Sequence, residues 1–235
     1  MPIKRSYSQI TPGGGGYRKI YKAPKKKTYS VASRSSSALS MSNTLLKTSQ
    51  VATLRYGLDF SLDPGIAGNP QVHLFSANGC YDPDVTGTGT QPRGFDQMML
   101  LYRHYVVEEA MIELYADPHD SAIGQLISIA VKDGTGPVTR KGVLEETIST
   151  MKGLAGSTGG PSAQYLKMSV KPLQFLGTSA KDDGAKGSST SNPSDQVIFS
   201  VSSMPNDQVD SSKVSFVGRI TYKVRFLEPT KPPDS

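Results

Sequence analysis

The first 58 residues contain no aspartate and no glutamate, and the first acidic residue is Asp59. The same stretch holds eleven of the 26 lysines and arginines of the chain. Residues 59–235 therefore carry 26 − 11 = 15 basic residues against all 20 acidic ones, a net charge of −5, although the whole chain has a formal charge of +6. A cationic N-terminal arm joined to a mildly acidic body indicates a polyanionic partner for the arm.

Other absences narrow the class of protein. Cys80 is the only cysteine, so no disulfide can form within the chain, which fits a reducing compartment. No apolar run approaches the roughly 20 residues of a membrane helix. The charges near the N-terminus lead into glycine rather than into an apolar core, which is unlike a secretory signal. These features predict a soluble intracellular protein that has no membrane partner.

The signatures of an enzyme or a metal site are also missing. The three histidines, His73, His104 and His119, lack the spacing of metal ligands, and no cysteine pair accompanies them. Neither a GxxxxGK[ST] phosphate loop nor a GxSxG motif occurs. A lone cysteine such as Cys80, in a glycine-rich loop, is more often structural than nucleophilic. We therefore expect no catalytic residue, no bound metal and no cofactor.

The arm, residues 1–50, is expected to be disordered in isolation. Gly13–Gly16 cannot hold a fixed backbone, and few apolar side chains are present to offset the entropy of ordering. Tyr7, Tyr17, Tyr21 and Tyr29 each lie within a few residues of a base. Cations neutralise phosphates and flat rings stack on unpaired bases, so this composition predicts binding of single-stranded nucleic acid. The predicted phosphate-binding residues of the arm are Lys4, Arg5, Arg18, Lys19, Lys22, Lys25, Lys26, Lys27 and Arg34.

Within the arm, Lys22 and Lys25, Lys26 and Lys27 form a compact basic cluster of the nuclear-import kind. Such clusters are common, so the signal is weak by itself. It predicts a host import receptor as a further partner.

The body alternates between apolar and polar residues over many short segments, which is typical of half-buried strands. Strands are predicted at residues 51–62, 71–77, 105–115, 123–132, 145–152, 164–171, 196–203 and 213–227. Long loops rather than tight hairpins separate them. Two packed antiparallel sheets, in a sandwich or jelly roll, are the natural architecture.

Three segments are less regular. Residues 95–102 predict a short helix, with Asp96 near its start. Residues 105–115 favour a helix by propensity and a strand by alternation, and the strand is preferred because Asp117-Pro118 follows. Residues 138–148 allow either a short helix or a loop followed by a strand from near Glu145.

Two segments of the chain are distinctive: Gln91-Pro92-Arg93-Gly94-Phe95-Asp96-Gln97-Met98 with Tyr102, and Ile220, Tyr222, Val224 and Phe226 with Glu228-Pro229. They resemble segments in the capsid proteins of small circular single-stranded DNA viruses, including circovirus-like ones. The resemblance implies a single eight-stranded jelly roll that assembles into a small icosahedral shell around genomic DNA. It places residues 51–62, 213–227, 105–115 and 164–171 in one sheet and the other four strands in the second.

This sheet assignment brings six bases to one polar face, which in this family tends to face the shell interior. They are Arg55, Lys167, Lys171, Arg219, Lys223 and Arg225. We expect Glu109 and Glu113 to be their neighbours. The face is then either a second, ordered phosphate-contacting surface or a solvated surface of cross-strand ion pairs, and the sequence favours neither.

The expected organisation is a basic arm at 1–50, a jelly-roll capsid domain at 51–228 and a short tail at 229–235. The expected function is a T=1 coat protein, without catalytic activity, that packages single-stranded DNA in a virion formed in the host nucleus. RNA remains open, because small RNA viruses share this plan. The alternatives are a cellular single-stranded nucleic-acid-binding or ribosome-associated β-sandwich protein, and an enzyme or sugar-binding sandwich.

Overall fold

A computed structural model describes residues 46–64, 70–85, 89–119, 124–135, 139–155, 163–205 and 213–231. Within these residues the chain forms eight strands and a few short helices. The strands are β1 (Ser49–Leu62), β2 (Gln71–Ser76), β3 (Tyr102–Pro118), β4 (Gln125–Asp133), β5 (Ser149–Leu154), β6 (Gln164–Val170), β7 (Val197–Pro205) and β8 (Val214–Pro229). The helices are α1 (Phe95–Leu101), α2 (Arg140–Glu145), α3 (Pro172–Leu176) and the 3-10 turn η3 (Asp183–Ala185).

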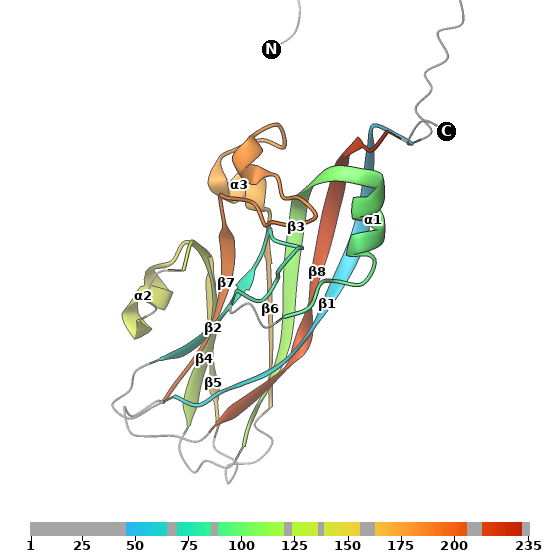
Figure 1. The fold of residues 1–235 in the computed structure, drawn as a ribbon. Coiled ribbons are helices and arrows are strands. Elements are labelled where there is room, and N and C mark those ends of the chain that lie inside the picture. The colour runs from blue at the N-terminus through green and yellow to red at the C-terminus, as the bar shows by residue number, and fades with distance from the viewer. Residues whose placement is uncertain are drawn as a thin grey trace, which may run out of the picture. The chain divides into compact units, whose positions relative to one another are not determined.

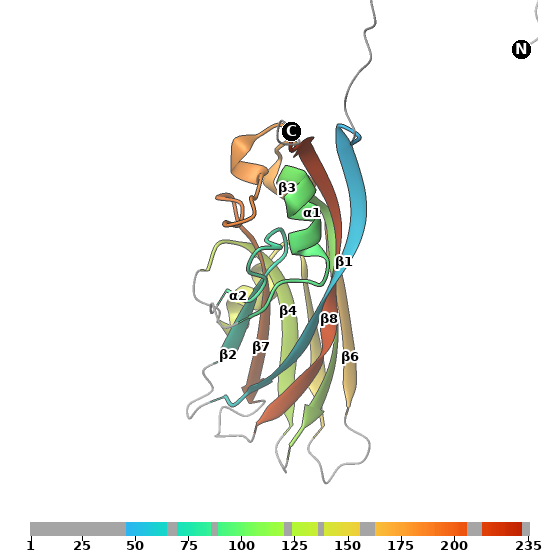
Figure 2. The ribbon, with the colours of Figure 1, turned by 45° about the vertical axis from the view of Figure 1, so that its right-hand side comes forward.

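The strands form two four-stranded antiparallel sheets. Their orders are β1-β8-β3-β6 and β2-β7-β4-β5. Figures 1 and 2 show the two sheets packed face to face, with α1 and α3 near the same end of the sandwich. The predicted eight-stranded jelly roll and the predicted membership of both sheets are therefore confirmed.

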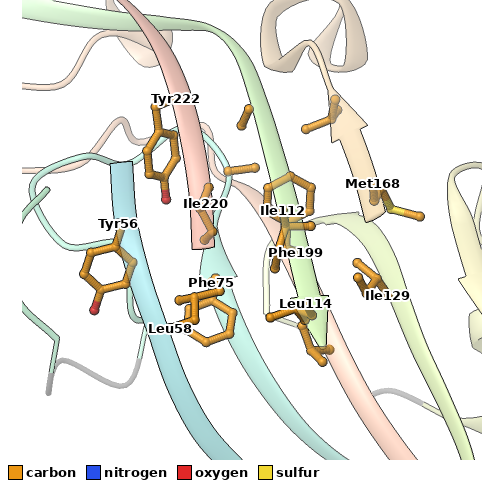
Figure 3. Close-up of a cluster of buried hydrophobic side chains, with 14 of the residues drawn as sticks. Tyr56, Leu58, Phe75, Ile112, Leu114, Ile129, Met168, Phe199, Ile220 and Tyr222 are labelled. Carbon is orange, nitrogen blue, oxygen red and sulfur yellow. The ribbon is translucent and has the colours of Figure 1, made fainter. Parts of the chain in front are cut away.

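The core lies between the sheets and is filled by the alternate residues of each strand. On β8 the buried set includes Ile220 and Tyr222, which Figure 3 shows among side chains from both sheets, such as Leu114 and Phe199. Full burial of side chains of this size stabilises the fold by about 1.5–3 kcal/mol each. Strand pairing is specific because a slip of one residue would turn this apolar set toward water.

The two ambiguous segments are now resolved. Residues 105–115 lie within β3, which is longer than predicted at both ends, and the predicted helix at 95–102 is α1. The strand predicted from near Glu145 begins only at Ser149, because α2 occupies Arg140–Glu145. The side chain of Thr139 caps α2 by accepting a hydrogen bond from the Gly142 amide at 3.0 Å.

Helix α3 was not predicted, because residues 164–171 alternate up to the point where the helix begins. Pro172 ends β6 and occupies the first turn of α3, where its fixed φ suits a helix and its missing N–H is no loss. Lys171, predicted as the last residue of the strand, is instead the residue that precedes α3.

Two long loops, residues 77–94 and 177–196, are joined by Asn78, which donates to the Asp195 carbonyl at 2.7 Å, and by a network around buried Tyr105 and Asn192. The Tyr105 hydroxyl accepts a hydrogen bond from the Cys80 amide at 3.0 Å and donates one to Asn192 Oδ1 at 3.2 Å. Asn192 Oδ1 also accepts from the Tyr81 and Asp82 amides, both at 3.1 Å, and its Nδ2 donates to the Asp82 carbonyl at 2.7 Å. This network satisfies loop amides that would otherwise be left unpaired inside the protein.

Candidate nucleic-acid interface

The candidate interface is the outer face of the β1-β8-β3-β6 sheet, the face that points away from the core. Alternation along the strands places Arg55, Lys167, Arg219, Lys223 and Arg225 on this face, where they are exposed or half-buried. Lys171 follows directly after β6 and is exposed. The structure thus brings five of the six predicted bases onto one sheet face and leaves the sixth at its margin.

Antiparallel pairing arranges these residues in rows across the strands. Glu113 on β3 lies opposite Arg219 on β8 and opposite Lys167 on β6. Its carboxylate accepts a hydrogen bond from Arg219 Nε at 2.9 Å, and Lys167 Nζ lies 3.8 Å away. Glu113 is therefore a neighbour of the bases, as predicted, and it is shared between two cations.

The hydroxyl of Tyr165 completes this row by donating to Glu113 Oε1 at 2.8 Å. The hydrogen bonds from Tyr165 and then from Arg219 hold the pKa of Glu113 below its usual value. The same bond raises the pKa of Tyr165, because ionising the phenol would place two negative charges together.

A second acidic centre lies further along the sheet, and it is Glu108 rather than the predicted Glu109. The pairing of β3 with β8 shifts by one residue between Val107 and Glu109, so an extra residue is inserted into β3 there. Glu108 accepts from Arg225 Nε at 2.7 Å, and Lys223 Nζ lies 3.2 Å from its other oxygen. Glu109 has no ion pair with a described residue. Glu109 is paired opposite Lys223, so it is a neighbour of the bases as predicted. The β-bulge, which cannot be read from alternation across two adjacent glutamates, makes Glu108 the acid that forms the ion pairs.

The environment of Glu108 keeps it ionised. Partial burial of its side chain, which is 22% exposed, favours the neutral acid. The hydrogen bonds from Arg225 and Lys223 outweigh this effect and hold the pKa of Glu108 below its usual value.

Glu108→Gln is expected to lower the free energy of unfolding by about 1 kcal/mol at pH 7. Because the folded chain lowers the pKa of Glu108, this contribution is complete above the ordinary value of 4.5 and is lost as the pH falls through the folded value. Urea unfolding of both proteins at pH 7 and at acidic pH measures it. Glu145→Gln is the control, since its partner Lys141 is 85% exposed and no change is expected. If both substitutions had the same effect, or if the effect of Glu108→Gln did not depend on pH, the ion pairs of Glu108 would not be the source of the stabilisation.

Four of the six predicted bases on the sheet are thus partly neutralised by two carboxylates. Arg55 and Lys171 have no ion pair within the described residues. The predicted phosphate contacts of all six remain a prediction, and ion pairing lowers the field that four of them offer to a polyanion. The predicted arm residues, from Lys4 to Arg34 and including the import cluster, lie outside the described residues.

Three exposed apolar residues on the same face were not predicted as part of a site. Tyr115, Tyr165 and Val217 lie in one row across β3, β6 and β8. The available signal was the presence of Tyr115 and Tyr165 at positions where alternation expects polar side chains.

Little in the described residues suits covalent or metal chemistry. Cys80 is fully buried, and its burial raises the pKa of the thiol far above neutral pH, which disfavours the reactive thiolate. No group of three or more His, Cys, Asp or Glu that could hold a metal ion occurs in the part of the chain that the structure describes. No helix among those residues is long and apolar enough to cross a membrane.

No family model and no curated protein matches the chain. Solved virus structures are similar to it. A chain from turnip yellow mosaic virus has a TM-score of 0.44 at 10% identity and covers 80% of this chain and 98% of its own length. A chain from tobacco necrosis virus has a TM-score of 0.39 at 15% identity and covers 78% of this chain and 98% of its own length. A chain from cocksfoot mottle virus has a TM-score of 0.42 at 13% identity and covers 77% of this chain and 96% of its own length. A likeness of this degree concerns the fold alone and assigns the chain to no family.

Proposed function

We propose that this chain is a viral coat protein, without catalytic activity, whose copies assemble into a closed icosahedral shell around single-stranded nucleic acid. The observation that carries the proposal is the segregation of charge: an acid-free arm precedes a net acidic jelly roll. A polyelectrolyte arm binds phosphates by releasing counterions, and a compact sandwich of this size can bury loop surface against symmetric copies of itself. In this proposal the arm packages the nucleic acid, and the sandwich forms the shell.

The organisation that follows has an arm at residues 1–50, a shell-forming domain at 51–228 and a tail at 229–235. Single-stranded DNA in a T=1 particle is the finer form of the proposal, and it depends on the resemblance of residues 91–98 to circovirus-like capsid proteins. Single-stranded RNA would use the same cations and rings. If particles purified from cells that contain both kinds of strand held RNA and no DNA, the proposal of a DNA genome would be wrong, and the proposal of a coat protein would stand.

The basic cluster of Lys22, Lys25, Lys26 and Lys27 is proposed to bind a host import receptor, so that assembly takes place in the nucleus. The distribution of a fluorescent fusion between nucleus and cytoplasm tests this step. If replacing all four lysines by alanine left the distribution unchanged, the cluster would not be the import signal.

Deleting residues 1–40 is expected to abolish most packaging while leaving the sandwich folded. The deletion removes nine of the eleven bases that precede Asp59, and binding driven by phosphate contacts falls steeply with loss of charge. The ratio of absorbance at 260 and 280 nm in sedimented particles measures the packaged nucleic acid, and circular dichroism checks the fold. Full nucleic-acid content in the truncated particles would overturn the role of the arm.

Particle size separates the proposal from its main rival. A cellular single-stranded nucleic-acid-binding or ribosome-associated protein with a basic tail would be a monomer or a small oligomer. A shell of many 25.2 kDa copies elutes in the megadalton range. A monodisperse small species, with no particles in negative stain, would favour the cellular protein.

A further inference from the structure

A row of exposed apolar side chains crosses the outer face of the first sheet. Tyr115 on β3 lies directly opposite Tyr165 on β6 and opposite Val217 on β8. Their exposed fractions are 63%, 37% and 56%. The two tyrosine rings are in contact, with centroids 4.9 Å apart and planes inclined at 42°. Because Tyr115 is the most exposed of the three, much of its ring surface is open to solvent.

The next row on the same three strands carries positive charge. Lys167, Glu113 and Arg219 are in register two residues further along, so the two rows lie about 6.8 Å apart. Two cations share one carboxylate here, which leaves this row with an excess of one positive charge. The side chains of Lys167 and Arg219 remain 52% and 55% exposed, so their donors are accessible to a further anion.

The two rows form one site. The Tyr165 hydroxyl donates to Glu113, which fixes the aromatic row against the charged one. A depression of about 410 Å³ is lined by residues of both rows, including Tyr115, Val217 and Arg219, and its size is that of sites for small ligands.

The charges around the aromatic row are distributed unevenly, with cations on one side and an acid on the other. The cations lie on one side of Tyr115, whereas Asp117 lies on the other side, two residues along β3. Asp59 on β1 is opposite Val217 at the end of the aromatic row furthest from Tyr165. A bound anion is therefore attracted toward Arg219 and Lys167 and repelled from the opposite side.

We propose that this surface binds one nucleotide of a single strand, with the base stacked on Tyr115 and the phosphate held by Arg219 and Lys167. The inference rests on the proposed function and adds a reason for preferring single strands. A base in a duplex is already stacked and cannot reach a ring on a sheet face, whereas an unpaired base can. The ion pairs then hold two cations in place for a phosphate instead of merely neutralising the face.

Photo-cross-linking of the full chain locates the contact directly. A single-stranded oligonucleotide carrying 5-iodouracil is irradiated with the protein, and the cross-linked peptides are identified by mass spectrometry. Cross-links at Tyr115 or Tyr165, in addition to arm tyrosines, are expected. Cross-links confined to the arm would overturn this inference and leave the proposed function standing. Failure of the full chain to bind the oligonucleotide at all would overturn both.

The variant Tyr115→Leu separates stacking from phosphate contact, because it keeps apolar bulk and removes the ring. Affinity for oligo-dT is expected to fall about tenfold, the loss of one stacked base, with no change for an abasic oligonucleotide of equal length. Tyr115→Phe is the matched control and should bind like the parent chain. Oligo-rU in place of oligo-dT distinguishes RNA from DNA as the strand preferred.

The rival occupant of the row is a second copy of the chain. In that case Tyr115→Leu would block particle assembly and leave affinity for both oligonucleotides unchanged, and the inference would be wrong. An equal loss of affinity for oligo-dT and the abasic strand would also overturn it, because the ring would then not contact a base.

Discussion

Gly218→Ala is expected to lower the free energy of unfolding of the sandwich by about 3 kcal/mol. Gly218 lies at a core-facing position of β8, opposite Leu114 on β3. A Cβ atom there would be 2.0 Å from the Glu113 carbonyl oxygen and 2.9 Å from Leu114 Cδ2. The first contact is with backbone of a central strand, which cannot rotate away as a side chain could. Thermal and urea unfolding of the purified variant measure the effect.

Gly57→Ala is the matched control for this prediction. Gly57 lies in β1 of the same sheet, and a Cβ built there meets no atom within 4 Å. Alanine should be neutral or stabilising by about 0.5 kcal/mol, since glycine within a strand costs conformational entropy. If Gly218→Ala unfolded at the same urea concentration as Gly57→Ala, β8 and β3 would be able to move apart more easily than the structure indicates.

Alternation was sufficient to predict the sheets because a strand with one buried face has little freedom of register. The run from Val214 to Phe226 repeats apolar residues at every second position, and it pairs with β1 and β3 as a central strand. Gly218 interrupts this run, and the reason is absent from the sequence. It depends on how closely β8 approaches the carbonyl of Glu113, which only the folded arrangement determines.

The partners of the sheet cations were predicted less well, for two physical reasons. A bulge adds one residue to β3, so the acid that reaches Arg225 is Glu108 and not Glu109. Tyr115 and Tyr165 occupy positions where alternation expects polar side chains, but only the pairing of β3 with β6 places them opposite each other as one aromatic row.

Asn192→Ala is expected to lower the free energy of unfolding by about 3 kcal/mol. The amide side chain accepts from the Tyr81 and Asp82 amides and from the Tyr105 hydroxyl, and it donates to the Asp82 carbonyl. Alanine would leave these part-buried groups without their partner, and an unsatisfied group shielded from water costs more than a hydrogen bond gains. Urea unfolding monitored by circular dichroism gives the free-energy change.

Tyr105→Phe tests whether the two residues act as one unit. It should cost about 1–3 kcal/mol, and the double variant with Asn192→Ala should cost less than the sum of the two, because both remove the same hydrogen bond. Tyr102→Phe is the control, since its hydroxyl makes one hydrogen bond, to the Lys47 carbonyl, at the margin of the fold. Strict additivity would show that the two loops are held independently.

We expect loops 77–94 and 177–196 to contact neighbouring copies, and in that case the same network links stability to assembly. Asn192 joins segments about 110 residues apart, so its loss weakens the link between the two loops. Other bonds, such as the one from Asn78 Nδ2 to the Asp195 carbonyl, and the strand pairing of the two sheets remain. Asn192→Ala should then lower the yield of particles at temperatures where circular dichroism still shows folded sheets. The Glu108→Gln variant, which is destabilised through the sheet instead of the loops, should assemble normally under those conditions. Parallel loss of particles and of folded sheet in Asn192→Ala would mean that the loops contribute to folding alone, and the shell contacts would have to lie elsewhere on the sandwich.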